Sequence, residues 1–408
     1  MKIAILGGGL AGLAAADVLS RDNDITIYEK NSYVGGLAAS FEHKGKKIPL
    51  HYHHIFDHDQ VTKRYLKSFG LTSTWRKAKM AICVNRKMYN FTDPISLLGF
   101  NHLSLIGRIR YGLFGLFVYT FMNPNKIPDH LDAQKWLKKA TGKEVTHKLF
   151  VPLYAENKFN IPLSEISAKQ FAHRLKAKEA TGLFGYPKKG LDEFINRFEN
   201  SLKKRKVKIL KDKPISTLDC KNKTIDGESY DKIIVTIPVP EFLKIQKNFN
   251  EEEVKRISKI KYCSCVSVVF GTKKFLSNHY WLNILKEKTH MLMQHSYLYD
   301  AYDSKVNWIL RYGGSEEDLE LTKDMITDKY LADVRKYFPN SDIQWAEVFK
   351  EKYASPIYDK NFHLNMPKIK NGDIYFAGVA VSYPLIRNMN TALISGRKVG
   401  KQVQKDSL

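Results

Sequence analysis

A glycine-rich turn near the start of the chain constrains the fold more than any other feature. The run Gly7–Gly12 has the pattern GxGxxG; it follows the short apolar stretch Lys2–Leu6 and opens the Ala- and Leu-rich segment Leu10–Leu19. The spacing of the apolar residues predicts a strand and then a helix, and Asp24–Tyr28 alternates as a second strand does. We therefore expect a βαβ unit at the N-terminus.

Each glycine of this turn has its own physical role. Gly7 allows the tight turn, Gly9 lets backbone amides approach a pyrophosphate at the helix N-terminus, and Gly12 allows close packing of helix against strand. Glu29 ends the second strand, 22 residues after Gly7, where a carboxylate accepts hydrogen bonds from ribose hydroxyls. The pattern predicts a dinucleotide site, and the alternative is a glycine turn that binds nothing. Lys2 and the apolar run also imitate a signal peptide, but cleavage would destroy the strand-turn-helix, so we reject that interpretation.

A glycine pair follows shortly after Glu29. Gly35 and Gly36 allow the chain to double back against a bound ligand, because glycine tolerates close approach of the backbone. Together with the first glycine run, the Ala-rich helix and Tyr28-Glu29-Lys30, this pair resembles the FAD-binding signature of the amine oxidase and protoporphyrinogen oxidase-like flavoprotein superfamily. The resemblance implies FAD rather than NAD as the cofactor. The residues that it places at the cofactor in this part of the chain are Gly7, Gly9, Leu10, Ala11, Gly12, Glu29, Lys30, Gly35, Gly36, Leu37 and Ala38.

Later segments are similar to the same superfamily. Asn371–Gly378 looks like its strand that ends in Ala-Gly, and Arg387–Gly396 looks like its helix that begins beside the flavin ring. The positive end of such a helix would stabilise the anionic reduced flavin. Pro214-Ile215, in a strand-like stretch, is similar to the position whose backbone contacts adenine. The further cofactor contacts that the resemblance implies are Ile215, Gly378, Asn388, Met389, Asn390 and Ala392. Arg387 becomes a candidate catalytic residue that holds an anionic substrate group or the flavin itself.

The chain departs from the family pattern at two points. Leu37 stands directly after the glycine pair, where many amine oxidases carry Arg, and this argues against a true amine oxidase. No cysteine follows Cys265, so the C-terminal cysteinyl-flavin link of monoamine oxidases has no counterpart. We therefore expect FAD to bind non-covalently.

Histidines are concentrated in the segment His51–His58. In an extended strand His51 and His53 share one face while His54 faces away, which argues against a metal site, and we expect no metal. The His-Ile-Phe tripeptide that starts at His54 resembles an element of UDP-galactopyranose mutases that passes beside the isoalloxazine. The resemblance makes His54 the first candidate for proton chemistry at the flavin and His53 a candidate cofactor contact. The alternative is that these histidines are purely structural.

The length and the order of the patterns predict a discontinuous α/β fold. Single cores stop growing near roughly 250–300 residues, and this chain has 408. We predict a Rossmann-like FAD-binding domain of the GR2 type, a second α+β substrate domain and a helical insertion. The expected boundaries are 1–58, 187–240 and 351–408 for the FAD-binding domain, 59–186 for the mostly helical cap and 241–350 for the β-rich substrate layer.

The net charge of the chain limits the classes of partner that it is expected to bind. Lys and Arg number 66 against 42 Asp and Glu, a net charge of +24, and such an excess suits anionic lipid, phosphorylated substrates or nucleic acid. No nucleic-acid motif accompanies the basic clusters, so we expect no nucleic-acid partner. The stretch Ile95–Met122 combines apolar residues with Arg108 and Arg110, which indicates either a peripheral helix on the inner face of a membrane or a cap helix over the substrate cavity. Scarce, scattered cysteines and the lack of a spanning apolar run fit a cytoplasmic protein.

The resemblance implies a flavin enzyme with a small-molecule substrate. The first hypothesis is an oxidoreductase in which an organic substrate, anionic or lipid-linked, gives a hydride to flavin N5. The alternative is a nucleotide-sugar isomerase like UDP-galactopyranose mutase that uses reduced FAD, and the segment Met88–Ile95 also looks mutase-like. A third hypothesis is a flavin-fold protein that binds a lipid or a partner without turnover.

Overall fold

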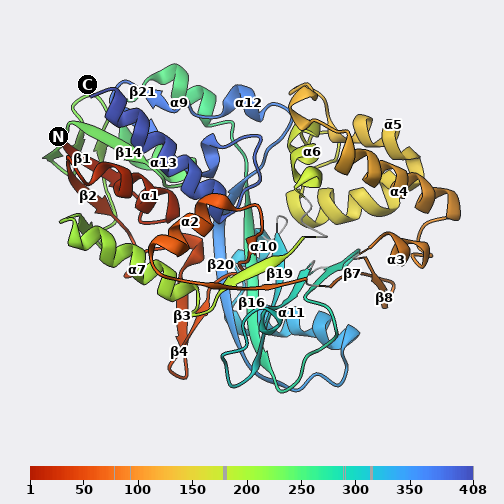
Figure 1. Ribbon diagram of the computed structural model, residues 1–408. Coiled ribbons are helices and arrows are strands. Elements are labelled where there is room, and N and C mark those ends of the chain that lie inside the picture. Colours follow the sequence, from red (N-terminus) through yellow and green to blue (C-terminus); the bar gives the residue numbers. More distant parts are fainter. Residues whose placement is uncertain are drawn as a thin grey trace. The chain divides into compact units, whose positions relative to one another are not determined.

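The computed structural model describes residues 1–77, 79–91, 93–177, 182–287, 289, 291–312 and 316–407. The chain divides into two compact units, each assembled from segments that are far apart in sequence (Figure 1). Unit 1 comprises Met1–Ser73, Pro187–Lys261 and Phe362–Leu408, and unit 2 comprises Thr74–Tyr186 and Tyr262–Asn361. Thr92, in the mutase-like segment Met88–Ile95, lies outside the described residues.

Unit 1 is built on a six-stranded sheet. In spatial order its strands are β10 (Lys208–Leu210), β2 (Asp24–Tyr28), β1 (Lys2–Leu6), β14 (Lys232–Val235), β22 (Ile374–Phe376) and β21 (Lys370–Asn371). All neighbours pair in parallel except β21, which is antiparallel to β22. The central strands are buried along most of their length, as expected for a parallel sheet covered on both faces. The α/β class and the Rossmann-like arrangement predicted from the sequence are confirmed.

The first and the last helix of unit 1 pack closely against each other. α1 (Leu10–Leu19) and α13 (Met389–Lys405) lie side by side, dark red and dark blue in Figure 1. A Cβ added at Gly396 would lie 2.1 Å from the Ala11 carbonyl oxygen, and one at Gly400 would lie 2.9 Å from the Val18 Cβ. Because later residues of α13 meet later residues of α1, the two helices run in the same direction.

Tertiary contacts place the boundaries of unit 1 differently from the sequence prediction of 1–58, 187–240 and 351–408. α2 (Gln60–Ser68) belongs to unit 1, because the Asn390 side-chain oxygen accepts from the Val61 and Thr62 amides at 3.0 Å each. α9 (Glu251–Ile257) also belongs to unit 1, where Arg256 donates to the Leu364 carbonyl at 3.3 Å.

The remaining elements of unit 1 are short apart from α7. They are η1 (Gly36–Ala38), β3 (Ser40–His43), β4 (Lys46–Pro49), β5 (Ile55–Phe56), α7 (Leu191–Lys204), β11 (Leu218–Asp219), β12 (Thr224–Ile225), β13 (Glu228–Ser229), α8 (Val239–Ile245), β15 (Gln246–Lys247), α12 (Phe362–Asn365) and η5 (Val379–Val381). Strands β13, β12, β11 and β15 form a small sheet, and β3 and β4 form a hairpin.

Unit 2 contains a seven-stranded sheet. In spatial order its strands are β20 (Ile343–Pro356), β16 (Tyr262–Thr272), β19 (Lys305–Tyr312), β18 (Met291–Gln294), β17 (Trp281–Ile284), β7 (Met80–Val84) and β8 (Lys87–Asn90). The helix α11 (Lys323–Tyr337) buries Ile326, Tyr330 and Val334 in the core cluster that includes this sheet. β20 pairs along β16, which is why residues 351–361 belong to this unit and not to the predicted FAD-binding domain.

The predicted helical cap, 59–186, contributes strands as well as helices to unit 2. β7 pairs in parallel with β17, about 200 residues later in the chain. Its five residues are all buried, and so short an apolar run does not distinguish a strand from a helix by period.

Helices form the rest of unit 2 around a core that includes Phe150, Phe159 and Phe171. The remaining elements of the unit, which include two short strands, are β6 (Ser73–Arg76), α3 (Pro94–Leu98), α4 (Leu105–Thr120), η2 (Pro124–Lys126), α5 (Ala133–Val145), the π-helical η3 (Thr146–Phe159), α6 (Ala168–Lys176), β9 (Phe184–Pro187), η4 (His295–Tyr297) and α10 (Glu316–Leu319).

The contact between α1 and α13 predicts a large effect of a single methyl group. Gly396→Ala would force its new Cβ against the Ala11 backbone, and we expect the free energy of unfolding to fall by about 1–3 kcal/mol, measured by urea denaturation. Gly115→Ala is the matched control, because an added Cβ there meets nothing within 4 Å and alanine favours a helix by up to about 1 kcal/mol. Equal losses in the two variants would contradict the packing argument.

Candidate functional site

The glycine run after β1 forms a tight turn. Gly7 has a φ of +103°, and its amide donates to the Tyr28 carbonyl at 2.8 Å. The Thr236 hydroxyl donates to the Leu6 carbonyl at 2.7 Å, which fixes the turn from β14. A Cβ at Gly12 would lie 2.1 Å from the Gly7 carbonyl oxygen. Gly7 and Gly12 therefore have the conformational and packing roles predicted from their spacing.

The N-terminus of α1 carries no side-chain cap. Gly9 is the N-cap residue and lacks a side chain, and the first turn of the helix holds no acidic residue. The amides at the start of a helix have no intrahelical acceptor, and the helix dipole favours negative charge there. The predicted contacts Leu10 and Ala11 lie in this first turn. This end of α1 is suited to bind a pyrophosphate.

Glu29 lies directly beside the glycine turn. Its buried carboxylate accepts from the Gly8 amide at 2.8 Å through Oε2, and from the Asn31 amide and side chain at 2.9 Å each through Oε1. A carboxylate has about four acceptor positions, so Glu29 is held in a fixed orientation and can still accept from a hydroxyl. The neighbouring Lys30, also predicted at the cofactor, is exposed.

The glycine pair contacts the first glycine run. The Gly35 amide donates to the Gly8 carbonyl at 2.8 Å, and a Cβ at Gly36 would lie 3.3 Å from the Gly9 Cα. Both residues of the pair have positive φ, +108° and +57°. The two segments that were predicted separately to approach a cofactor thus form one continuous backbone surface. After them, Leu37 is exposed and Ala38 is buried.

The C-terminal glycine lies at the same end of the sheet. Gly378 follows β22 with a φ of +99°, and its amide donates to the Ser395 hydroxyl at 2.9 Å. A Cβ at Gly378 would lie 3.8 Å from the Ala11 Cβ, so this turn is next to the start of α1. Because α13 runs parallel to α1, its N-terminus points to the same edge of the sheet.

The residues that open α13 make contacts within unit 1. Asn388 is the N-cap, its side chain accepting from the Thr391 amide at 2.8 Å, and Ala392 donates to the Asn388 carbonyl at 3.1 Å. Met389 is buried, and Arg387, one residue before the N-cap, is half-buried. The Asn390 side-chain oxygen is used by the α2 amides, so only its amide group and its backbone are left for the predicted cofactor contact.

Ile215 does not lie in a strand, contrary to the strand-like stretch expected around it. Residues 211–217 form an irregular segment between β10 and β11. The reason is that its backbone bonds to loops: Lys213 donates to the Glu29 carbonyl at 2.9 Å, and Thr217 donates to the Asp226 carboxylate at 2.8 Å. Ile215 is half-buried, two residues after the contact with Glu29.

The first four residues of the histidine segment, His51–His54, are half-buried and precede β5. The His53 Nδ1 and the His51 carbonyl oxygen are 2.9 Å apart. Burial lowers the pKa of His51 to about 3 and that of His53 to about 4, so both are neutral at pH 7. The His54 ring packs edge-on against Phe56 with centroids 4.7 Å apart. Across the described ranges, no three or more His, Cys, Asp or Glu side chains converge as a metal site would require.

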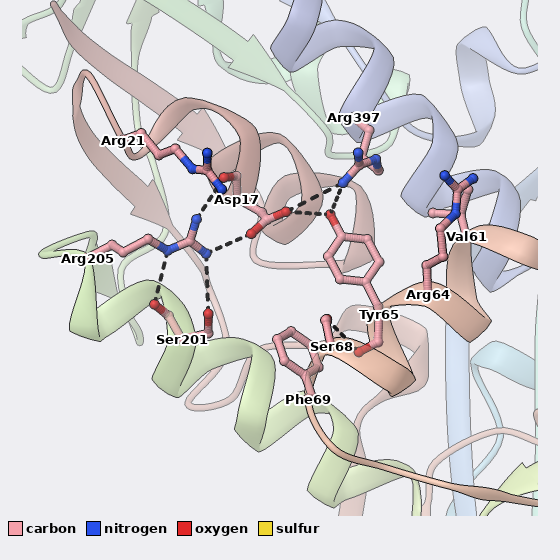
Figure 2. A pocket seen from close by; sticks show the side chains of 10 residues that line it. All are labelled: Asp17, Arg21, Val61, Arg64, Tyr65, Ser68, Phe69, Ser201, Arg205 and Arg397. Carbon is pink, nitrogen blue, oxygen red and sulfur yellow. Dashed lines mark hydrogen bonds and ion pairs between the residues drawn. The ribbon is translucent and has the colours of Figure 1, made fainter.

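A separate hollow of about 450 Å³ lies among α1, α2, α7 and α13 (Figure 2). At its centre the Asp17 carboxylate accepts from Arg205 at 2.7 Å and from the Tyr65 hydroxyl at 2.8 Å, and lies 3.7 Å from Arg397. Burial and the Asp17 charge raise the pKa of Tyr65, which keeps its hydroxyl protonated as a donor. Asp17 is eight residues beyond Gly9 along α1, about 12 Å at 1.5 Å per residue. The hollow therefore surrounds an ion cluster that joins α1 to α2, α7 and α13. It is distinct from the glycine surface.

Sequence reasoning missed several side chains that position the site. Thr236 and Ser395 anchor the two glycine turns, and the Asp59 carboxylate accepts from the Phe56 amide at 2.9 Å and from Asn388 at 3.5 Å. Thr236 directly follows the buried apolar strand β14, at the edge of the sheet where the glycine turns lie, so the sequence carries a signal for its position. Ser395 and Asp59 have no comparable local signal.

Comparison with known proteins identifies the family. The sequence profile of the flavin containing amine oxidoreductases matches residues 10–404. The chain belongs to this family. Membership of this family makes it a flavin-dependent oxidoreductase. The family resemblance that was predicted from the glycine motifs is confirmed.

The curated proteins that match this sequence are distantly related to it or match only a short stretch of it. An uncharacterised protein of Methanocaldococcus jannaschii is 23% identical over 287 residues, which cover 68% of this chain and 68% of the relative. The zeta-carotene desaturase of Solanum lycopersicum is 35% identical over 72 residues, 17% of this chain and 12% of that protein.

Solved structures share the whole fold. A candidate protoporphyrinogen oxidase from Exiguobacterium sp. 255-15 has a TM-score of 0.79 at 15% identity, covering 99% of both chains. A reduced UDP-galactopyranose mutase has a TM-score of 0.79 at 16% identity, covering 99% of this chain and 95% of the other. A putrescine oxidase bound to putrescine has a TM-score of 0.77 at 12% identity and 99% coverage of both chains. At these identities the similarity shows the fold.

The contact between the glycine segments predicts that a methyl group at Gly36 weakens flavin binding. Gly36→Ala would strain a left-handed backbone and press on Gly9, and we expect roughly tenfold weaker binding from 1–2 kcal/mol of strain. The measurement is flavin absorbance per polypeptide after gel filtration. Gly45→Ala has a similar φ, +72°, with nothing within 4 Å, and should keep its flavin. If both variants lose flavin equally, the contact is not the cause.

The lowered pKa values of His51 and His53 predict a pH dependence of stability. Because the folded pKa values of about 3 for His51 and about 4 for His53 lie below the ordinary value of 6.5, the unfolded chain binds more protons between about pH 4 and 6.5. Stability should therefore fall as the pH drops through this window and stay level above it. We expect a lower unfolding temperature near pH 5 than at pH 7, and a smaller drop in His51→Gln/His53→Gln. The exposed control His58→Gln should retain the full drop; a stability that rises on acidification would contradict the assignment.

Proposed function

We propose that this protein binds FAD non-covalently and oxidises an organic substrate that is anionic or lipid-linked. The observation that carries the proposal is the continuous glycine surface formed by Gly7–Gly12 and Gly35-Gly36, which lies beside the uncapped end of α1 and the buried carboxylate of Glu29. When bound, FAD supplies the hydride-accepting chemistry. The chain's own residues supply position, charge and proton transfer.

The donor and acceptor groups of unit 1 fit the parts of FAD. The start of α1 offers the positive end of the helix dipole, with no side-chain cap, to the pyrophosphate. Glu29 offers a fixed acceptor to a ribose hydroxyl. The irregular segment around Ile215, which contacts the Glu29 backbone through Lys213, is the proposed adenine contact. The start of α13, with Asn388 as its cap, would favour negative charge on the flavin ring.

Cysteine placement supports non-covalent binding. Cys220 is the cysteine of unit 1, and its amide donates at 2.8 Å to the Lys247 carbonyl in the small sheet that contains β11 and β15. Burial raises the pKa of its thiol to about 12, so the reactive thiolate is scarce. Cys83, Cys263 and Cys265 are buried in unit 2.

Two residues are proposed to act on the substrate. His54 is half-buried and its ring is fixed by Phe56, so it can hold or move a proton at its imidazole. Arg387, at the entrance to α13, offers a guanidinium to an anionic group of the substrate. Because His51 and His53 are neutral, they add no competing positive charge to this segment.

A second candidate function is a nucleotide-sugar mutase reaction with reduced FAD. The His-Ile-Phe element at His54 favours it, and so does the net charge of +24, which suits a diphosphate substrate. The fold shared with the reduced UDP-galactopyranose mutase is compatible with both functions.

The first experiment is the absorption spectrum of the purified protein, followed by anaerobic reduction with dithionite and exposure to oxygen, a quinone or UDP-galactopyranose. We expect a flavin spectrum with FAD released on denaturation, reoxidation by oxygen or quinone, and no conversion of the sugar. Conversion of the sugar only by the reduced protein would favour the mutase instead.

A histidine variant gives the control for chemistry at the flavin. His54→Gln should retain bound FAD and lower turnover by at least about a hundredfold, whereas His58→Gln should keep both. A wild-type protein that holds FAD but turns over with none of these reactants would favour a binding protein. Failure to bind added FAD would overturn the proposal.

A further inference from the structure

One stretch of unit 2 exposes an unusual number of large apolar side chains. Of the 19 large hydrophobic residues that are exposed among the described residues, ten lie between residues 95 and 121. The other nine are scattered from Met1 to Leu385. Scattered exposed apolar residues are normal, whereas a large contiguous apolar patch marks an interaction site.

The helix α4 carries most of this patch on one face. Its inner face buries Gly107, Phe114 and Val118 in or beside the core of unit 2. Its outer face repeats at helical spacing and is exposed, for example 66% at Ile106 and 61% at Leu113. The residues of this outer face are Leu105, Ile106, Ile109, Leu113, Leu116 and Phe117. A helix that is apolar all round is normally covered on all sides, and α4 is covered on only one.

Neighbouring segments add to the same patch. Ile95 in α3 is 79% exposed, and Phe121, which caps the C-terminus of α4, is 78% exposed. α3 is fastened to α4 because the Arg108 side chain donates to the Leu98 carbonyl and, at 3.3 Å, to Asn101. We call Ile95, Leu98, the outer face of α4 and Phe121 the apolar face.

The charges around the apolar face are positive. The sequence holds no Asp or Glu from residue 94 to residue 128, whereas Arg110 and Lys126 are exposed there. α5, which packs on α4, adds the exposed Lys139 and Lys143. A Cβ at Gly142 would lie 2.8 Å from the Arg110 guanidinium, so that cation lies over α5 beside Lys143.

The acidic groups of this region are already paired. Glu144 accepts from the Ser104 amide at 2.9 Å and from Lys148 at 3.0 Å, which fastens the start of α4 to α5. Asp129 pairs with Lys169 at 2.7 Å, and Asp132 lies 3.7 Å from Lys135. Asp93, the N-cap of α3, accepts from the Ser96 amide at 2.8 Å and is the exception near Ile95. The exposed charges beside α4 and α5 are otherwise mainly cationic.

We propose that the apolar face docks this protein on the surface of an anionic lipid membrane. A surface of apolar side chains with flanking cations matches the boundary between acyl chains and anionic headgroups. A second copy of the chain fits less well, because a two-fold interface on this face would set like charges of the two copies against each other. The docked helix would lie in the plane of the membrane, with its inner face still on the core of unit 2.

The length of α4 agrees with a surface position. Its 16 residues span about 24 Å at 1.5 Å per residue, which is less than the roughly 30 Å hydrocarbon core. None of the helices in the described ranges combines the length and apolarity that crossing a bilayer requires.

The test is cosedimentation of the whole protein with vesicles. We expect binding to vesicles of phosphatidylcholine mixed with phosphatidylglycerol, and weaker binding both to phosphatidylcholine alone and at high salt. Ile106→Gln/Leu113→Gln should lower the affinity at least tenfold, because it removes two apolar side chains from the face. Arg110→Gln/Lys143→Gln should lower it roughly fivefold per charge and reduce its salt dependence.

A matched control separates the face from general apolarity. Met325→Gln removes an exposed apolar side chain from α11, elsewhere in unit 2, and should bind vesicles as the wild type does. Because all substituted residues are exposed, thermal unfolding should change little in every variant. No vesicle binding by the wild type, or unchanged binding by Ile106→Gln/Leu113→Gln, would overturn the proposal. A dimer seen by light scattering would also overturn it, if Ile106→Gln/Leu113→Gln dissociated that dimer and the wild type bound no vesicles.

Discussion

The close packing of α1 on α13 is the interaction on which the proposed flavin site depends. Gly396 and Gly400 let the last helix approach the backbone of the first, and the two helices run in the same direction. Their N-termini therefore lie at the same edge of the sheet, where the turns at Gly7 and Gly378 also lie. Any side chain at these glycines would separate the helices and move one positive helix end away from the other. The proposed site combines residues from both ends of the 408-residue chain. The lack of side chains at Gly396 and Gly400 is what lets these two ends come together.

The parts of the site that sequence reasoning predicted are those with a backbone requirement. A positive φ at Gly7, Gly35 or Gly378, or an approach too close for a Cβ at Gly12, leaves a glycine in the sequence that no other residue can replace. Thr236, Ser395 and Asp59 act through single hydrogen bonds to distant backbone groups. Such residue types occur throughout the chain, so their roles depend on tertiary contacts that local patterns do not encode.

The division into units shows the same limit on a larger scale. The apolar run of β7 does not reveal that it pairs with β17, because parallel pairing joins segments that are remote in sequence. Likewise α2 looks like the start of the helical cap, yet its N-terminal amides are capped by Asn390 from the other end of the chain. The class of the longer elements was predictable from their period, whereas the unit to which α2 and β7 belong was set by hydrogen bonds to partners hundreds of residues away.

The apolar face and the proposed flavin site both bear on whether the substrate is linked to a lipid. In the sequence, residues 95–122 were compatible with a membrane helix or with a cap helix, because both need the same apolar period. Covering the outer face of α4 would stabilise the complex by about 25 cal/mol for each Å² of apolar surface removed from water. This favours binding to a partner that covers the face. If that partner is a membrane, a lipid-linked substrate would be concentrated at the same surface as the enzyme. The membrane proposal and the flavin chemistry are nevertheless independent, since the first rests on residues of unit 2 and the cofactor fit rests on residues of unit 1. Vesicle binding without turnover, or turnover without vesicle binding, would therefore separate them.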